Sequence, residues 1–186
     1  MHAKTYKLSA LCAIFGLLLT GCLHDKALDA NKHNPQSSTV VINAVSPEGV
    51  GEKIGTITLT DTTQGLRIQS SLGELPSGFH GFHIHEKGSC EPAEKDGKQV
   101  AALAAGGHFN PHNSGHGTPN DGHMGDLPVL NVDSNGNANT IALAPRLKLA
   151  DVKGRAIMIH AGGDNYSDQP KPLGGGGDRI ACGVIQ

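Results

Sequence analysis

The chain has 186 residues, enough for one domain with a sizeable hydrophobic core. Its formal net charge of −2 gives no reason to expect nucleic acid as a partner. Aromatic residues make up only 3% of the chain and Gly contributes 26 residues, a composition that favours a β-rich fold with many turns over a helical bundle.

Residues 1–21 have the pattern of a bacterial export signal. Two lysines precede a mostly apolar stretch, Leu8 to Leu19, which is too short to span a bilayer comfortably. Leu19-Thr20-Gly21-Cys22 resembles the bacterial lipobox, in which the Cys is acylated and becomes the first residue of the mature protein. An ordinary signal peptide cleaved nearby is the alternative. Either pattern predicts export, and Leu23, where an Asp would favour inner-membrane retention, indicates an outer-membrane anchor that faces the periplasm.

Residues 22–38 are polar and are interpreted as a flexible tether that follows the lipidated Cys22. His24 and His33 lie in this tether. We interpret them as solvated side chains, with metal binding as the alternative. The remaining residues, 39–186, are predicted to form the single folded domain.

The cysteines indicate one candidate disulfide, which depends on the protein reaching an oxidising compartment. Cys12 leaves with the signal, so that only Cys90 and Cys182 remain besides the candidate lipid site. In an oxidising compartment these two can form a disulfide, with two buried free thiols as the alternative. A bridge would close a loop of about 92 residues, for which chain entropy predicts about 4–5 kcal/mol of stabilisation.

From Thr39 onward, apolar residues alternate with polar ones in short segments, which is typical of β-strands. The predicted strands are residues 39–45, 53–59, 64–72, 79–86, 127–132, 139–143, 155–160 and 180–185. Turns are expected at Ser46-Pro47-Glu48-Gly49 and Asp133-Ser134-Asn135-Gly136. The pattern predicts an all-β fold, a Greek-key antiparallel sandwich or flattened barrel.

Two long connections interrupt the strands, at residues 87–126 and 161–179. Structureless loops of that length are unusual in a compact domain unless they are functional. The second contains Gly174 to Gly177. Because no Lys-Ser/Thr pair follows, as it would in a phosphate-binding loop, we interpret this run as a flexible connection.

Seven of the eleven histidines fall between Phe79 and Asp126. On a strand, His83 and His85 point to the same face with Cα atoms about 6.7 Å apart, while Ile84 turns to the core. His160 ends another apolar strand and can supply a third imidazole, a ligand that suits copper and zinc.

The first long loop adds a second set of metal-binding residues, namely His108, His116, His123 and Asp126. Imidazoles with one carboxylate suit a tetrahedral zinc ion. A zinc site beside a copper site then allows one imidazolate to bridge the two ions through both ring nitrogens.

Four segments of the chain resemble the signature segments of the copper/zinc superoxide dismutases: Gly81-Phe82-His83-Ile84-His85-Glu86, Gly107-His108-Phe109-Asn110-Pro111, His123-Met124-Gly125-Asp126-Leu127 and Arg179-Ile180-Ala181-Cys182-Gly183-Val184. The resemblance runs in order from about Thr39 to Gln186. Residues 161–168 resemble the bacterial periplasmic branch, and the loop between His108 and His123 is shorter than in eukaryotic members. Eukaryotic dimer contacts are therefore not carried over, and a homodimer stays possible.

The resemblance implies a role for each site residue. Copper, one ion per subunit, would be bound by His83, His85, His108 and His160. Zinc, also one per subunit, would be bound by His108, His116, His123 and Asp126, with His108 as the bridge. Asp164 would link His83 to His116, and Cys90 would form the family's disulfide with Cys182.

The implied reaction converts the superoxide anion to oxygen and hydrogen peroxide by Cu(II)/Cu(I) cycling. His108 would carry a proton, and Arg179 would attract the anion. Lys87 would add positive charge, with a solvated surface Lys as the alternative. An enzyme outside the cytoplasm would protect the cell envelope from external superoxide, because an anion crosses membranes poorly.

Several alternatives remain at this point. His80 is interpreted as structural, and His112 competes with His116 for zinc, although Gly117-Thr118-Pro119 favours His116. A metal carrier on the same fold would be expected to lack a copper ligand or the Arg. A zinc hydrolase would need an open zinc position, which three His and one Asp close.

Overall fold

The computed structural model describes residues 1–2 and 36–186. The predicted signal from residue 3 onward lies outside the described residues, as do Cys22, His24 and His33. In the described part the elements are, in chain order, β1 (Ser37–Ser46), β2 (Gly49–Thr62), β3 (Gly65–Leu72), β4 (Gly78–His80), β5 (Phe82–His85), β6 (Ala93–Lys95), β7 (Lys98–Val100), β8 (Leu130–Val132), β9 (Ile141–Ala144), α1 (Leu149–Val152), β10 (Ala156–His160) and β11 (Arg179–Val184), with single turns of 3₁₀ helix at Leu103–Ala105 and Pro172–Gly175.

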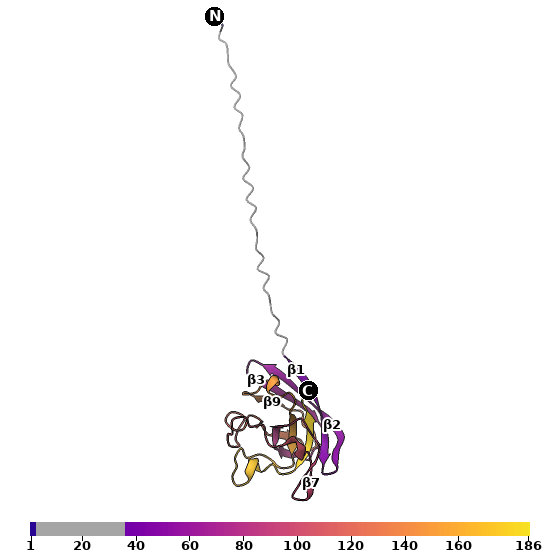
Figure 1. Cartoon of the computed structure of the whole chain (residues 1–186). Coiled ribbons are helices and arrows are strands. Elements are labelled where there is room, and N and C mark those ends of the chain that lie inside the picture. Colours follow the sequence, from indigo (N-terminus) through magenta and orange to yellow (C-terminus); the bar gives the residue numbers. More distant parts are fainter. Residues whose placement is uncertain (3–35) are drawn as a thin grey trace. The chain divides into compact units, whose positions relative to one another are not determined.

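Seven strands form one antiparallel sheet with the order β5-β10-β11-β1-β2-β3-β9. The sheet curls into a half-barrel (Figure 1), and β4 pairs with β8 in a separate two-stranded ladder. This confirms the predicted mostly antiparallel all-β architecture. The order also brings β5, β10 and β11 together, although long loops separate them in sequence.

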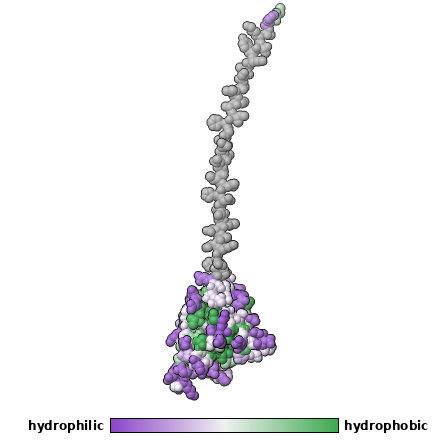
Figure 2. All heavy atoms as spheres, turned by 90° about the vertical axis from the view of Figure 1, so that its right-hand side faces the viewer, coloured by the Kyte–Doolittle hydropathy of each residue, from purple (hydrophilic) through white to green (hydrophobic). Residues whose placement is uncertain are grey.

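The alternation of residues along the strands explains which side chains enter the main core. On β3, Leu66, Ile68, Ser70 and Leu72 are all buried and the residues between them are exposed or partly so. Figure 2 shows apolar side chains among hydrophilic ones on the face that lies to the right in Figure 1. The core itself is enclosed by the curl of the sheet.

The strand β10 differs because all five of its residues are buried. Ile157 and Ile159 pack in the main core, whereas Ala156 and Met158 pack on the other side of the sheet with both cysteines of the disulfide. A strand that is covered on both faces shows a continuous apolar run instead of alternation. The histidines of β5 and β10, namely His83, His85 and His160, lie on this second side.

Two predicted strands are shorter than expected. Residues 79–86 divide into β4 and β5 at Gly81, whose N–H donates to the carbonyl oxygen of Gly162 at 2.7 Å. The strand predicted at residues 127–132 is reduced to β8, because Pro128 has no N–H to donate to a ladder. In contrast, β1 begins at Ser37, inside the segment assigned to the tether.

The first long connection contains a hairpin that the sequence analysis did not predict. Its strands β6 and β7 pair around Asp96-Gly97, two residues that both have positive φ, of 53° and 75°. Asp-Gly between two short strands is a recognised signal for such a turn. It was missed because the flanking residues are polar and show no alternation. In the described part of the chain, no helix is long and apolar enough to cross a membrane.

Candidate metal centre

The strand β5 presents two histidines on one face of the sheet. His83 and His85 face away from the main core, whereas Ile84 between them is 0% exposed and belongs to it. β10 pairs with β5, and its last residue, His160, donates its backbone N–H to the carbonyl oxygen of Gly81 at 2.9 Å. Three imidazoles from two adjacent strands therefore meet on one side of the sheet.

One cluster, called here the four-histidine group, consists of buried residues whose possible ligand atoms lie within 4.8 Å of one another: His83, His85, His108 and His160. The Nε2 atoms of His85 and His160 are 3.3 Å apart. Their other ring nitrogens are held by backbone carbonyls, since His85 Nδ1 donates to Gly106 at 2.9 Å and His160 Nδ1 donates to Gly177 at 3.1 Å. These bonds fix the tautomers and leave each Nε2 available to a metal ion.

A second cluster, called here the Asp126 group, meets the same distance limit: His83, His108, His116 and Asp126. The residues expected to bind zinc include His123 in place of His83. His123 Nδ1 lies 3.3 Å from His108 Nδ1 and 3.3 Å from Asp126 Oδ1, so it contacts this group directly. His83, like His108, belongs to both groups by this distance limit, and its ring stacks on that of His108.

His108 lies between the two groups. Its Nδ1 is 3.0 Å from Asp126 Oδ1 and faces His123. Because Nδ1 faces the Asp126 group, Nε2 is the atom that can serve the four-histidine group. One imidazole ring can therefore contact two ions at once.

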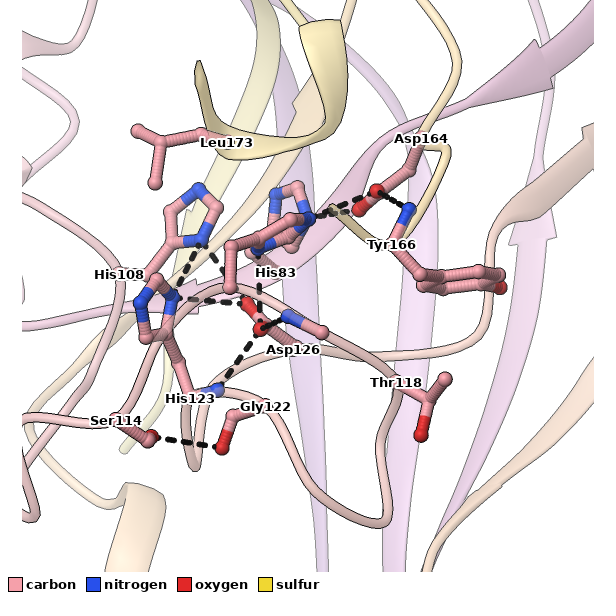
Figure 3. Close-up of polar contacts among 12 residues, drawn as sticks. His83, His108, Ser114, Thr118, Gly122, His123, Asp126, Asp164, Tyr166 and Leu173 are labelled. Carbon is pink, nitrogen blue, oxygen red and sulfur yellow. Dashed lines mark hydrogen bonds and ion pairs between the residues drawn. The ribbon is translucent and has the colours of Figure 1, made fainter. Parts of the chain in front are cut away.

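The carboxylate of Asp126 is oriented by its own loop. The backbone N–H groups of Gly117 and His123 donate to Asp126 Oδ2 at 3.0 and 2.9 Å (Figure 3). Ser114 Oγ donates to the carbonyl oxygen of Gly122 at 2.9 Å and closes the same loop. The loop is thus folded around one carboxylate, which it presents to the histidines.

Asp164 connects the two groups from the second long loop. Its two oxygens accept hydrogen bonds from His83 Nε2 at 2.7 Å and from His116 Nε2 at 2.8 Å. The backbone N–H of Tyr166 adds a third bond, to Oδ1 at 2.7 Å (Figure 3). Asp164 therefore fixes both imidazoles with Nδ1 pointing inward.

The surroundings of the two inward-pointing Nδ1 atoms indicate whether the residues of the two groups suit metal ions. His83 Nδ1 and His116 Nδ1 are buried and make no hydrogen bond, although His116 Nδ1 lies 3.1 Å from Asp126 Oδ2. Buried nitrogen atoms without partners are costly, and metal coordination satisfies them. The donor set of imidazole nitrogens with one carboxylate is chemically suited to copper and zinc.

The electrostatics of the metal-free site favour neutral rings at His108 and His160, a charged ring at His116 and charged carboxylates. Burial lowers the pKa of His108 to about 4 and that of His160 to about 3, so both rings are neutral at neutral pH, as metal binding requires. Burial also disfavours the charge on His116, but its close contact with the Asp126 carboxylate and its hydrogen bond to Asp164 outweigh burial and raise its pKa to about 9. Burial alone would raise the pKa values of the Asp126 and Asp164 carboxyls. Their contacts with the histidines outweigh burial and hold both pKa values well below the usual range.

Arg179 lies beside the four-histidine group at the start of β11. Its guanidinium donates to the carbonyl oxygens of Ala102 and Gly106, at 2.5 and 2.6 Å. The Gly106 oxygen also accepts the bond from His85, so that one carbonyl positions both side chains. Burial lowers the pKa of Arg179, which nevertheless stays charged at neutral pH.

The disulfide predicted between Cys90 and Cys182 is present, with the two sulfurs 2.00 Å apart. Cys182 lies on β11, three residues after Arg179, and Cys90 lies at the start of the first long loop. The bridge therefore ties this loop to the strand that carries Arg179. Two free thiols are excluded by this geometry.

The remaining histidines of this region lie outside both groups. His80 is buried, and its two ring nitrogens lie 2.7 and 2.8 Å from the carbonyl oxygens of His160 and Pro76. His112 is exposed and belongs to neither group, whereas its rival His116 is buried in the Asp126 group. Lys87 is exposed.

One residue that positions the Asp126 group escaped the sequence analysis. Arg146 donates three hydrogen bonds to carbonyl oxygens of the loop, to Pro119 at 2.8 Å, Gly122 at 2.9 Å and His123 at 2.7 Å. It therefore holds the backbone on which His123 is mounted. No sequence signal distinguishes it, because a single Arg after a predicted strand reads as a surface charge.

Comparison with known proteins gives matches over most of the described domain. Residues 53–185 match the family described as copper/zinc superoxide dismutase (SODC). The chain is 56% identical over 153 residues to the copper–zinc superoxide dismutase of Escherichia coli (strain K12), a match that covers 81% of this chain and 88% of the relative.

Two solved structures are similar in fold. The Cu/Zn superoxide dismutase from Brucella abortus superposes with a TM-score of 0.80 at 51% identity, covering 81% of this chain and 100% of that one. The monomeric copper, zinc superoxide dismutase from Salmonella enterica gives a TM-score of 0.74 at 56% identity, with the same coverage.

Proposed function

The chain belongs to the copper/zinc superoxide dismutase family, and on that premise we propose that its four-histidine group binds copper and that its zinc ligands are His108, His116, His123 and Asp126. Family membership makes it an oxidoreductase that acts on superoxide with copper and zinc as cofactors. The division of its residues between the two ions rests on the motif resemblance, and the contacts of His123 with His108 and Asp126 support it.

The chemistry of the donors supports this division. A carboxylate with three imidazoles closes a tetrahedral zinc site, and zinc has no redox chemistry of its own. The four-histidine group offers nitrogen donors only, which suit copper. His83 completes that group, since it shares one face of β5 with His85 and its Nδ1 points inward.

In the reaction, two superoxide anions and two protons give one molecule of oxygen and one of hydrogen peroxide. Copper in the four-histidine group supplies the one-electron redox chemistry by cycling between Cu(II) and Cu(I). Arg179 attracts the anion with a fixed positive charge beside His85. His108 takes up a proton at Nε2 and passes it to the peroxide product, while Nδ1 stays with the Asp126 group.

The observation that carries this proposal is that His108 belongs to both groups and has a ring nitrogen for each, since its Nδ1 faces Asp126 and His123, whereas His83, which also belongs to both groups, has its Nε2 bonded to Asp164. The test is superoxide dismutation by the purified protein, with copper and zinc measured on the same sample and cyanide as a control. We expect activity with about one copper and one zinc per chain, lost with cyanide. Fully metallated protein without activity would instead support a metal carrier on the same fold.

For the location, we propose export to the periplasm and a lipid anchor at Cys22. The lipobox-like Leu19-Thr20-Gly21-Cys22 supports acylation, and the Cys90–Cys182 disulfide is typical of an oxidising compartment. Labelling cells with a radioactive fatty acid tests this: the wild-type protein should incorporate the label and sediment with outer membranes, and Cys22→Ala should do neither. Unlabelled wild-type protein in the soluble periplasmic fraction would contradict the anchor.

We further propose that the enzyme protects the cell envelope from superoxide generated outside the cell. An enzyme in the periplasm meets this anion before it reaches the cytoplasmic membrane, which an anion crosses poorly. Deleting the gene should sensitise cells to an extracellular superoxide source and not to one inside the cytoplasm. Equal sensitivity to both sources would contradict this role.

A further inference from the structure

The glycine tract, Gly174–Gly177, is packed into the metal centre. Gly174 and Gly176 are buried, and backbone hydrogen bonds hold both residues. The N–H of Gly174 donates to Ser167 at 3.0 Å, and the carbonyl oxygen of Gly176 accepts from Gly162 at 2.7 Å. The run that the sequence analysis interpreted as a flexible connection is therefore an ordered part of the second long loop.

Gly174 lies directly against the contact between Asp164 and His116. A Cβ atom at this position would lie 2.5 Å from Asp164 Cγ and 2.8 Å from His116 Nε2, and would overlap Asp164 Oδ1. Asp164 has no room to give way, because its hydrogen bonds to His83, His116 and the N–H of Tyr166 hold it in place. The absence of a side chain at Gly174 thus permits the bond that orients His116.

Gly176 lies against His160 in the same way. A Cβ atom here would be 3.2 Å from both Cβ and Cγ of His160, which is tighter than an ordinary van der Waals contact. The next residue, Gly177, supplies the carbonyl oxygen that accepts the hydrogen bond from His160 Nδ1 at 3.1 Å. The backbone at Gly176 and Gly177 therefore sets both the position and the tautomer of His160.

We propose that the glycine tract is a positioning element for both metal ions, in which Gly174 sets the zinc ligand His116 through Asp164 and Gly176 sets the copper ligand His160. This inference rests on the proposed ligand assignments. Its residues touch no substrate and act only through the side chains they position. The tract thereby links the second long loop to both halves of the centre.

The tract contains its own control. Gly175 has φ of +80°, close to the +70° of Gly174, but a Cβ atom there would meet only Lys171, at an ordinary 3.7 Å. Gly175→Ala therefore introduces the same kind of backbone strain without touching a ligand. Gly176 has φ of −57°, which Ala adopts freely, so any effect of Gly176→Ala arises from its contact with His160.

The experiment measures zinc and copper affinities by chelator competition for the full-length wild-type protein and the three Ala variants, together with the Cu(II) electron paramagnetic resonance spectrum. Loss of a residue that orients a metal ligand costs about 10–100-fold in affinity. We expect Gly174→Ala to lose zinc affinity by this factor. Gly176→Ala should show a changed Cu(II) spectrum and a copper affinity about 10-fold weaker. Gly175→Ala should keep metal affinities and a spectrum near those of the wild type. Gly174→Ala with the zinc affinity of Gly175→Ala would overturn the proposal.

A double variant distinguishes positioning from general damage. In an Asp164→Ala background the carboxylate that Gly174→Ala would overlap is gone, and only the 2.8 Å approach to His116 Nε2 remains, which the ring can relieve once Asp164 no longer holds it. The further loss of zinc affinity should therefore shrink to a few-fold, and the double variant should fold. An undiminished loss, or failure of the double variant to fold, would contradict transmission through Asp164. If wild-type protein binds no copper or zinc through these histidines, the ligand assignment fails instead, and the two failures remain distinguishable.

Discussion

The imidazole ring of His83 stacks on that of His108, with the ring centroids 3.9 Å apart and the planes inclined by 25°. The stack joins β5 to the first long loop, where the N–H of Phe109 donates to the carbonyl oxygen of Ile84 at 2.8 Å. The shared histidine is thus held in register with the strand that carries His85. Both residues of this stack belong to the four-histidine group and to the Asp126 group, so the stack joins the two groups.

Removing one ligand from each proposed site should affect the binding of one metal more than that of the other. His160→Ala takes a donor only from the four-histidine group, so we expect dismutation to be abolished and zinc to be retained. Asp126→Ala removes the only carboxylate among the zinc ligands, and zinc affinity should fall by more than about 100-fold, since even residues that merely orient a ligand cost 10–100-fold. Metal analysis after dialysis measures both, and equal loss of both metals in each variant would contradict the assignment.

Asp164→Asn tests the link between the two groups. An amide keeps the shape of the carboxylate but has one acceptor oxygen, so it can accept from His83 or His116 and not from both. We expect zinc and copper affinities to weaken together by about 10–100-fold. Chelator competition measures both affinities, and unchanged values would mean that the hydrogen bonds at 2.7 and 2.8 Å do not orient the ligands.

Replacing Cys90 and Cys182 by Ala should lower stability. The bridge closes a loop of 92 residues, and loss of a native disulfide typically costs about 2–5 kcal/mol. Denaturant unfolding of metal-free protein should show this decrease relative to wild type. Reduced wild-type protein is the matched control and should behave like the double variant, whereas unchanged stability would indicate that the loop is held by its other contacts.

Metal-free protein should lose stability as the pH falls below about 6.5. His108 and His160 have folded pKa values of about 4 and 3, so between those values and 6.5 the unfolded chain binds more protons than the folded one. Unfolding is then favoured by up to about 1.4 kcal/mol per pH unit for each residue. Urea unfolding at pH 5, 6 and 7 measures this slope.

His116 should produce the opposite trend on the alkaline side. Its folded pKa of about 9 lies above the ordinary value, so the stability it contributes is complete below about 6.5 and is lost as the pH rises towards 9. The stability of the metal-free protein should therefore be greatest near neutral pH. A flat profile from pH 5 to 9 would contradict both the burial of His108 and His160 and the contacts of His116 with Asp126 and Asp164.

The sequence predicted those features that depend on local periodicity. His83, Ile84 and His85 follow a period of two, so their division between metal centre and core was predictable once β5 was recognised. The strand boundaries were less predictable from the sequence. β8 is shortened by Pro128, and β4 and β5 separate at Gly81 through a contact with Gly162. Ligand identities came from motif resemblance.

The features that the sequence did not predict depend on contacts between distant loops. Gly106 and Gly177 orient histidines through their backbone carbonyl oxygens, a role that no sequence motif records. Arg146 reaches the loop of His123 only because the chain returns there after β9. The packing of Gly174 depends equally on the folded path of the second long loop.

The most direct test of the shared centre is a crystal structure of the metal-loaded protein with anomalous difference maps recorded at the copper and zinc absorption edges. We predict two separate peaks on opposite sides of the His108 ring. The copper peak should lie among His83, His85 and His160, and the zinc peak among His116, His123 and Asp126. A single peak, or copper and zinc in exchanged positions, would contradict the account.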